Sequence, residues 1–364
     1  MSFLKSYDII ISEYFFAGFL NVDKLILDGM GGDNAPAAIV EGAVKALKDD
    51  KQLYLIIAGR EGEIKAELSK YKYDSSRVEI LDCPDVIGMN DVPTEAIRNR
   101  QASLTAAFWE LRKQDDICGL VTAGSTGATI AGGQLILGRI KGVKRAALCP
   151  AIPNLDGGVT LLCDCGANAE CKPVMLCQFA VLASAYAQAG FGKTNPRVGL
   201  LNNGTEEHKG DPLRQETYKY LSYMKGIDFV GNVEGRNINM GGVDVVVADG
   251  FSGNVALKSI EGCAKMILAT MKKQFKSSPA SLLGAAFAGG AIKRMKKGLD
   301  FDKYGGALLL GLKKVVVKSH GSSKPVAITN SIKNALSIYR NGLIPKIENM
   351  LSEVDLDNLI PAVQ

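Results

Sequence analysis

VGLLNNGTEEHKG (198–210) runs from an apolar strand into a polar, glycine-flanked loop that carries a lysine. Three similar junctions occur elsewhere in the chain, at DGMGGD (28–33), DCGAN (164–168) and DGFSGN (249–254). In open α/β sheets, ligands bind at the carboxyl ends of the strands. Four polar junctions of this kind therefore predict a single site for a small anionic group.

Apolar runs alternate with helical stretches along most of the chain. Pro36, Pro93 and Pro173 supply helix starts, for helices that end near residue 49 and span residues 94–113 and 174–188. This alternation predicts one α/β domain over residues 23–364, with a parallel-type sheet covered on both faces. The predicted strands are residues 24–27, 53–58, 78–81, 117–122, 159–162, 198–201, 228–230 and 243–248.

The composition is that of a globular protein and limits the classes of ligand and partner to expect. Of its 364 residues, 47% are apolar and 22% charged, as in soluble globular proteins. A net charge of +5, one tryptophan and no recognisable binding motif argue against a nucleic-acid partner. Two histidines are too few for a His-rich metal site, so we expect no metal.

Cysteine spacing leaves two readings open. The chain has eight cysteines, and Cys163, Cys165, Cys171 and Cys177 cluster without the paired Cys-x-x-Cys of zinc sites. A structural metal is one reading, and reduced thiols that fill the core are the other. The spacing favours reduced thiols and therefore a cytoplasmic protein.

Residues 1–22 are aromatic and apolar, but Lys5, Asp8 and Glu13 interrupt them. These charges break the hydrophobic core that a signal peptide needs, and the run is too short and polar to span a membrane. We interpret residues 1–22 as an N-terminal extension.

A helical hairpin at about residues 253–298 departs from the alternating pattern. Residues 253–275 predict a long helix, Ser277-Ser278-Pro279 a break, and residues 282–297 a second helix. Between Gly262 and Leu299 there is no acidic residue, although eight basic ones occur there: Lys265, Lys272, Lys273, Lys276, Lys293, Arg294, Lys296 and Lys297.

The apolar residues near the turn of this hairpin are Leu282, Leu283 and Phe287. Beside basic residues they suit an anionic bilayer surface, where each basic residue contributes roughly 1 kcal/mol. Packing of the helix pair on a second subunit is the alternative, and a tip that protrudes from a dimer satisfies both.

The chemistry-bearing residues form no nucleophilic triad. AGSTGA (123–128) follows a strand and opens a helix, which suits either a phosphate cradle or an N-capping turn. GGDNAP (31–36) is not a dinucleotide fingerprint, and a tight turn capped by Asp33 explains it equally. Lys209 has little reason to lie among Asn, Gly and Thr for packing, so it is the candidate anion-binding group. Asn254 is either an amide donor or part of a helix cap that Ser252 supplies.

Several long motifs in order resemble the bacterial phosphate acyltransferases of phospholipid synthesis, the PlsX family. The motifs cover residues 24–340 and are LDGMGGDNAP (27–36), AGSTGAT (123–129), CDCGANAECKP (163–173), LLNNGTEEHKG (200–210), GNVEGRNI (231–238), VADGFSGNVALK (247–258), YGGALLLGLKK (304–314) and SHGSS (319–323).

The resemblance implies a three-layer αβα sandwich similar to isopropylmalate and isocitrate dehydrogenases and to phosphotransacetylase, and a homodimer. It implies transfer of a long-chain acyl group from acyl carrier protein to inorganic phosphate, without a cofactor, and peripheral contact with the membrane. The family's functional lysine and asparagine fall on Lys209 and Asn254. Many relatives have His at the position of Asn34 and Asn at that of Ser125.

Combining the resemblance with the residues predicts a phosphate site among Ser125, Thr126, Asn168 and Lys209. Asn254 and Lys209 would stabilise the oxyanion, and the acyl chain would lie between the hairpin and the helix at residues 127–137. The basic surface would attract acidic acyl carrier protein. The full set of expected substrate-binding residues is Asp28, Gly31, Gly32, Asp33, Gly124, Ser125, Thr126, Gly127, Asn168, Lys172, Asn203, Thr205, His208, Asp249, Ser252 and His320.

Two other functions compete with this one. An NAD-dependent hydroxyacid dehydrogenase of the same fold would need an aspartate cluster for metal and a cofactor loop, and the sequence has neither. A non-catalytic scaffold at the membrane would explain the hairpin but not the four polar loops.

Overall fold

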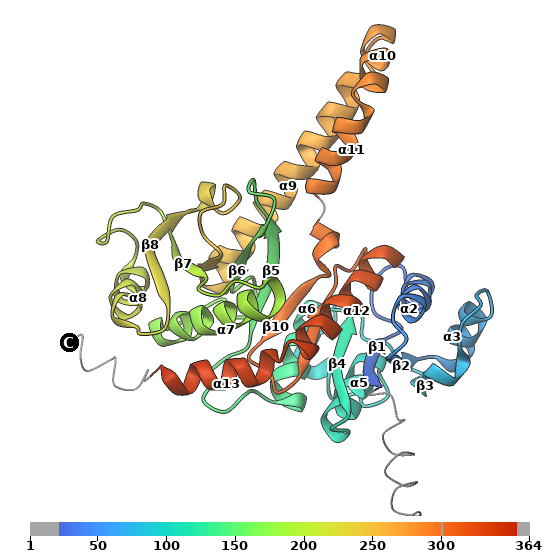
Figure 1. The fold of residues 1–364 in the computed structure, drawn as a ribbon. Helices are drawn as coiled ribbons and strands as arrows, with labels where there is room; N and C mark the ends of the chain where they lie inside the picture. The colour runs from blue at the N-terminus through green and yellow to red at the C-terminus, as the bar shows by residue number, and fades with distance from the viewer. Residues whose placement is uncertain (1–21, 300, 355–364) are drawn as a thin grey trace, which may run out of the picture.

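An eleven-stranded mixed sheet organises residues 22–299 and 301–354, which are the residues that the computed structural model describes (Figure 1). The strand order is β3 (Val78–Asp82), β2 (Leu53–Gly59), β1 (Asp23–Asp28), β4 (Ile117–Thr122), β11 (Val315–Lys318), β10 (Ala307–Leu310), β5 (Ala147–Pro153), β6 (Val159–Cys163), β9 (Val245–Val247), β7 (Arg197–Asn202) and β8 (Asp228–Glu234).

The sheet has two halves that share β5. Residues Ala147 to Pro150 of β5 pair with β10, and Ala151 to Pro153 pair with β6. The first half runs from β3 to β10, and the second from β6 to β8.

The predicted parallel-type sheet is wrong at this junction. β10 is antiparallel to both β11 and β5, and β5 is antiparallel to β6. The eight predicted strands are present, whereas β5, β10 and β11 were not predicted. β5 and β10 each lead into another strand and not into a helix, so the alternating pattern does not reveal them. β11 is followed by α12 (Pro325–Arg340) and fits the pattern, but it was missed.

Three neighbouring parallel strands of the first half end side by side. β1 pairs in parallel with β4, and β4 pairs in parallel with β11, with Lys318 opposite Thr122. Asp28 is the last residue of β1, as Thr122 is of β4 and Lys318 of β11. The carboxyl edge of the first half therefore brings these three polar residues into one row.

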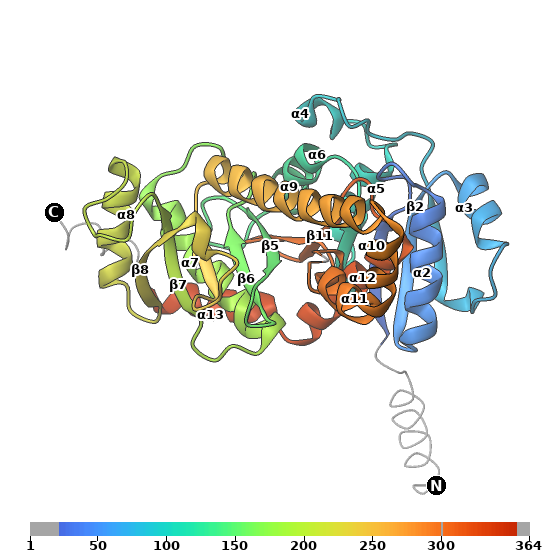
Figure 2. The same ribbon diagram turned by 90° about the horizontal axis from the view of Figure 1, so that it is seen from above.

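Side chains alternate across the sheet and make a three-layer sandwich. On one face, Leu25 and Leu27 belong to a core formed with α2 (Ala37–Asp49), α7 (Pro173–Phe191), α12 (Pro325–Arg340) and α13 (Leu343–Glu353). On the other face of the first half, Ile26 packs with residues of α5 (Ser103–Lys113) and α6 (Thr126–Gly132). On that face of the second half, Leu162 and Val246 pack with Leu257 of α9 (Gly250–Phe275) (Figure 2).

Two helices, α3 (Glu61–Leu68) and α8 (Pro212–Tyr223), lie at the two ends of the sheet. The continuous helix predicted at 94–113 is wrong, because α4 (Pro93–Ala96) is a single turn and α5 begins only at Ser103.

The cysteines are free thiols. Six of the eight are buried in the core, whereas Cys171 is half-buried and Cys263 is exposed.

The hairpin projects from the body of the molecule (Figure 1). α9 leads outward, and α10 (Pro279–Phe287) and α11 (Gly289–Gly298) return beside it. The second helix begins at Pro279 and is divided at Ala288, so the single helix predicted for 282–297 is incorrect in detail. Leu282, Leu283 and Phe287 are 58%, 65% and 92% exposed, so none of the described residues covers this tip. Lys293, Arg294 and Lys296 are exposed on α11, where Lys297 also lies.

Among the described residues, α7 alone is long and apolar enough to cross a membrane by length and composition. It is the central helix of the larger core, and 72% of its apolar window is buried inside the protein. The extension at residues 1–21 lies outside the described residues.

Candidate active site

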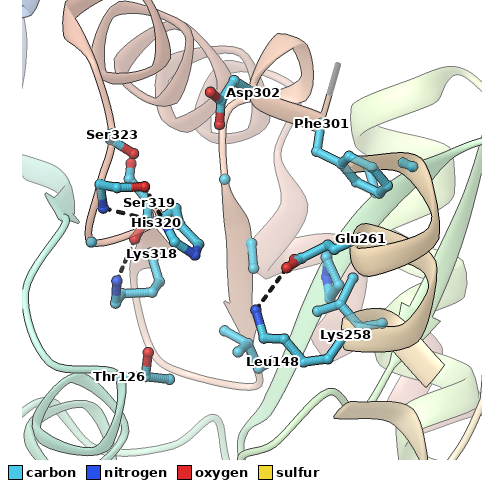
Figure 3. Close-up of a pocket in the computed structure, with 18 of the residues that line it drawn as sticks. Thr126, Leu148, Lys258, Glu261, Phe301, Asp302, Lys318, Ser319, His320 and Ser323 are labelled. Carbon is cyan, nitrogen blue, oxygen red and sulfur yellow. Dashed lines mark hydrogen bonds and ion pairs between the residues drawn. The ribbon is translucent and has the colours of Figure 1, made fainter. Parts of the chain in front are cut away.

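A cavity of about 500 Å³ lies between the two halves of the sheet. Its polar end consists of Asp33, Thr126 and the segment from Lys318 to Ser323 (Figure 3). Its other walls are mixed and continue along α9. Their apolar members are Leu148, Pro150, Ala151, Leu257, Ala264, Leu268, Leu299, Phe301 and Ala307, and their charged members are Lys258, Glu261, Lys265 and Asp302. A ligand with a polar head and an apolar tail matches this division.

The loop after β1 is fixed by Asp28. The Asp28 carboxylate accepts hydrogen bonds from the hydroxyls of Ser103 (2.6 Å) and Thr122 (2.7 Å). Burial raises the pKa of Asp28, although these two hydrogen bonds oppose the shift. A Cβ on Gly31 would lie 2.3 Å from the Asp28 carboxylate and 2.7 Å from the Gly124 nitrogen, so only glycine fits there. Asp28, Gly31 and Gly124 thus hold two of the predicted loops against each other.

Glycine is also required at the next position. Gly32 has a φ of +97°, and a Cβ there would lie 2.8 Å from the Gly321 carbonyl oxygen. The Asp33 backbone N–H donates to that same carbonyl at 2.8 Å. The loop after β1 therefore packs on the SHGSS loop, which brings Asp33 and His320 to the same end of the cavity.

The AGSTGA segment forms the start of α6. The Ser125 hydroxyl accepts a 3.4 Å hydrogen bond from the Ala128 N–H, so Ser125 is the N-cap. Thr126 is exposed and lines the cavity, whereas a Cβ on Gly127 would lie 2.5 Å from Pro93. The N-capping turn is therefore confirmed, and the phosphate cradle stays a prediction that the position of Thr126 on the cavity wall allows.

The SHGSS loop is held by local hydrogen bonds. His320 Nδ1 lies 2.8 Å from the Ser322 hydroxyl, and the Asn34 amide donates to the carbonyls of Ser322 and Ser323. Asn34 is therefore a support of this loop. The Ser323 hydroxyl is buried and has no hydrogen-bond partner among the described residues.

Lys318 is the buried cation of the cavity. It is 7% exposed and its ammonium donates to the carbonyl oxygen of Ser319. Within residues 22–299 and 301–354, no carboxylate lies within ion-pair distance of this ammonium. Burial lowers the pKa of Lys318 to about 8, although Asp28 and Asp33 act in the opposite direction.

The second half contributes a loop fixed by Asp164. Both Asn168 nitrogens donate to the Asp164 carboxylate, at 2.7 Å from the backbone and 2.9 Å from the side chain. The Asn168 amide also donates to the Ala146 carbonyl, and the Asn168 carbonyl accepts from the Gly250 N–H. Both amide hydrogens of Asn168 are thus used within the protein, which makes it a positioning residue for this loop.

Arg214 connects α8 to the start of α9. It donates to the carboxylates of Asp211 (2.7 Å) and Asp249 and to the Ser252 hydroxyl (2.9 Å). Burial acts to raise the pKa of Asp249, but hydrogen bonds from Ser252 and the Arg214 charge outweigh it and hold that pKa below its usual value. Asp249 also caps α9 by accepting from the Ser252 N–H.

The predicted catalytic pair lies in the second half, beside this junction. Asn254 is exposed on the first turns of α9, and a Cβ on Gly166 would lie 3.6 Å from its amide carbon. Lys209 is half-buried, and its carbonyl accepts a hydrogen bond from the Asn202 amide. Neither residue lines the 500 Å³ cavity. Of the other predicted residues on this side, Asn203, Thr205, His208 and Lys172 are exposed.

The structure thus arranges the predicted residues in two groups. Asp33, Thr126 and His320 line the cavity, backed by Asp28, Gly31, Gly32, Gly124, Ser125 and Gly127. Asn168, Asp249, Ser252 and Asn254 gather at the start of α9, whose next turns carry the cavity residues Leu257 and Lys258. Lys258 is paired with Glu261 at 3.0 Å.

Sequence reasoning missed Lys318, Ser323 and Arg214. The signal for Lys318 and Ser323 is VVVKSHGSS (315–323), an apolar β-branched run that ends in a lysine and a polar glycine loop. It is the same signature as the four junctions recognised from the sequence. No comparable signal marks Arg214: Asp211 is three residues away, but the partners that tie it to α9, Asp249 and Ser252, are 35 and 38 residues away in sequence.

Among the described residues, no group of three or more His, Cys, Asp or Glu side chains is placed to hold a metal ion.

Comparisons with known proteins identify the family. Residues 23–346 match the model of the family described as fatty acid synthesis protein. A phosphate acyltransferase from Clostridium perfringens is 42% identical over 335 residues, covering 92% of this chain and 98% of that protein. One from Fusobacterium nucleatum is 43% identical over 328 residues, covering 90% and 99%.

Solved structures share the fold at low identity. A phosphotransacetylase from Staphylococcus aureus has a TM-score of 0.52 at 18% identity, covering 88% of this chain and 95% of that one. A branched-chain phosphotransacylase from Enterococcus faecalis has a TM-score of 0.55 at 14% identity, covering 87% and 99%. On the sequence matches, the chain belongs to the PlsX-type phosphate acyltransferases, a family of acyltransferases in lipid biosynthesis.

Proposed function

We propose that this protein transfers a long-chain acyl group from acyl carrier protein to inorganic phosphate, and that the acyl phosphate formed enters phospholipid synthesis. One observation carries the proposal: one cavity joins a polar end beside the start of α6 to a wall along α9 on which Leu257, Ala264 and Leu268 alternate with charged residues. This shape suits an acyl phosphate, whose head is anionic and whose tail is apolar.

The proposed reaction needs no protein nucleophile. A hydrogen phosphate oxygen attacks the thioester carbonyl carbon, and the carbonyl oxygen becomes a tetrahedral oxyanion. The intermediate collapses with cleavage of the carbon–sulfur bond, and the proton of hydrogen phosphate passes to the thiolate. The products are acyl phosphate and the free thiol of the carrier.

Proposed roles follow from the placement of the side chains. Thr126 and the first N–H groups of α6 bind phosphate, with Ser125 and Asn168 positioning the two loops that flank it. Lys209 and Asn254 stabilise the oxyanion at the start of α9, where loss of one donor costs about 3–4 kcal/mol in comparable sites. The acyl chain extends along α9 past Ala264 and Leu268. This path lies along one side of the groove expected between the hairpin and residues 127–137, which stays a prediction.

Location and assembly complete the proposal. A cytoplasmic homodimer would place the hairpin tips on the anionic membrane surface, where the exposed apolar residues enter the interface and the basic ones face the headgroups. The same basic surface would attract acidic acyl carrier protein.

The direct test supplies palmitoyl-acyl carrier protein and radiolabelled inorganic phosphate to the purified full chain. We expect label in a lipid-extractable product that hydroxylamine converts to a hydroxamate. Release of carrier thiol without labelled product would indicate hydrolysis and contradict the proposal. A parallel nicotinamide absorbance assay with hydroxyacids tests the dehydrogenase alternative.

A further inference from the structure

Two buried polar groups with unused hydrogen-bonding capacity line the polar end of the cavity. Lys318 is 7% exposed, and its ammonium has only the Ser319 carbonyl as a partner among the described residues. Ser323 is 5% exposed, and its hydroxyl has none. Figure 3 shows Lys318 between Thr126 and the His320 loop, all of which line the same cavity.

Burying the Lys318 ammonium and the Ser323 hydroxyl without full hydrogen bonding lowers the stability of the ligand-free protein. A buried ammonium retains three donors, and a carbonyl satisfies one of them without balancing the charge. Buried charges in proteins are normally paired or hydrogen-bonded, because desolvation costs several kcal/mol per ion. The pairing missing from the protein itself points to an anionic ligand.

The strand register places Lys318 next to the strand that leads into α6. Lys318 is opposite Thr122, the residue that ends β4 directly before the AGSTGA segment. The Gly124 N–H of that segment donates to the Thr122 hydroxyl at 2.9 Å. Lys318 therefore borders the start of α6 from the neighbouring strand.

We propose that Lys318 and Ser323 form the phosphate-binding subsite of the cavity, with Lys318 as the counter-ion of the phosphate that attacks the thioester. This inference rests on the proposed function, and it assigns phosphate to residues outside the Lys209 loop. The Ser323 hydroxyl donates to a second phosphate oxygen, and Thr126 closes the subsite from α6.

The charges around Lys318 predict how binding depends on pH. Asp28 and Asp33 face it from the β1 end and loop, Lys258 from α9, and His320 from its own loop, with Glu261 and Asp302 farther along the cavity. Because burial lowers the pKa of Lys318 to about 8, the ammonium of the free protein loses its proton as the pH rises through that value. Phosphate affinity should therefore fall across the same range.

The test measures binding of inorganic phosphate to the full chain by titration calorimetry, without any acyl donor. We expect Lys318→Met to weaken binding by about 30-fold or more, as for a truncated buried charge contact. We expect Ser323→Ala to weaken binding by about tenfold, as for a hydrogen bond to a charged group. The wild-type affinity should decline above about pH 8, and this decline should be absent in Lys318→Met.

Lys314→Met is the matched control. Lys314 lies just before β11, at the far end from the cavity, and is half-buried with its ammonium 2.5 Å from the Gln114 carbonyl. Burial lowers its pKa as well, so the control removes a comparable lysine from outside the site. Its phosphate affinity should match that of the wild type.

The outcomes separate this inference from the proposed function. Unchanged phosphate affinity in both Lys318→Met and Ser323→Ala overturns the subsite even if acyl phosphate is formed. Weakened phosphate binding in a protein that forms no acyl phosphate supports the subsite and rejects the acyl transfer. If the variants raise only the KM for acyl carrier protein, the subsite holds the phosphate of the carrier's prosthetic group, and the proposal is wrong. If Lys318→Met does not fold, Ser323→Ala and the wild-type pH dependence still decide.

Discussion

Lys318 on β11 lies opposite Thr122 on β4, and the Thr122 hydroxyl donates to Asp28 at the end of β1. Three adjacent strands thus end in a carboxylate, a hydroxyl and an ammonium at one edge of the sheet. The carboxylate is occupied by two hydroxyl donors, so the ammonium is left for a ligand.

Removing Lys318 should stabilise the protein while impairing phosphate binding. The pKa of this lysine falls from 10.5 to about 8 on folding, so its protonated form is disfavoured in the native state. Below about pH 8, burying the protonated Lys318 lowers the free energy of unfolding by its full amount. As the pH rises from about 8 towards 10.5, the buried lysine becomes neutral and this destabilisation disappears. Lys318→Met should therefore raise the free energy of unfolding at neutral pH by about 3 kcal/mol at most. Urea titrations of the wild type and Lys318→Met without phosphate measure the difference in unfolding free energy at neutral pH and near pH 10.5. The variant should be more stable at neutral pH only, and an equal gain in stability at both pH values would contradict this prediction.

Lys209 and Asn254 should be essential for turnover but not for folding. Lys209→Ala and Asn254→Ala should each lower kcat for acyl phosphate formation by about 10²–10³-fold, as for loss of an oxyanion donor. Because Asn254 is exposed and Lys209 only half-buried, Tm should not change. The control is Lys219→Ala, an exposed lysine on α8. A near-normal rate in Lys209→Ala would remove the role assigned to that residue.

Arg214 should be a structural requirement of the second half. Arg214→Gln leaves the Asp249 carboxylate, which is 5% exposed, without its cation, and this typically costs about 3–5 kcal/mol. Because the pKa of Asp249 lies below its usual 3.8, its contribution to stability is present above that pH and is lost on acidification.

Denaturant unfolding of Arg214→Gln should show the expected loss of unfolding free energy. The stability of this variant should also fall less on acidification than that of the wild type. Arg236→Gln removes an exposed arginine that pairs with Glu234, and should change stability by no more than about 0.5 kcal/mol. Equal effects of the two variants would argue against a special role for the Arg214 contact.

Substitution in the apolar wall should change chain-length selectivity. Ala264→Phe places a ring in the cavity beside Leu268, so kcat/KM for a long acyl chain should fall by about tenfold or more relative to a short one. Ala269→Phe is the control, because Ala269 is exposed on the same helix and does not line the cavity. An equal fall in kcat/KM for acyl donors of every length would show that the acyl chain does not lie along this wall.

The hairpin tip should bind membranes. Serine at Leu282, Leu283 and Phe287 together should abolish sedimentation with anionic phospholipid vesicles, since each removes exposed apolar surface. Thermal stability should be unchanged. Leu155→Ser, at a 78% exposed leucine in the turn between β5 and β6, should leave vesicle binding intact. A change in oligomeric state without loss of vesicle binding would assign the tip to subunit contact.

Sequence patterns predicted the parts of this fold whose signals are local. Strands such as β4 follow from one apolar run. α7 begins at Pro173 as expected, and α2 begins at Ala37, with the predicted start residue Pro36 as its N-cap. The antiparallel junction was not predictable, because pairing of β5 with both β10 and β6 depends on partners far apart in sequence. Lys318 was predictable in part, because VVVKSHGSS (315–323) is a local signal for a strand that ends in a polar loop. Its position beside Thr122 was not, because that depends on the pairing of β11 with the distant β4.

β5 has a mechanical consequence. Its first residues are bonded into one half and its last into the other, with Pro150 at the change of partner and on the cavity wall. Bending this strand would therefore rotate α9, with Leu257 and Lys258, relative to Thr126 and Lys318. Such a rotation would also have to shift α7 against α12 and α13, because these helices pack in one core that spans both halves.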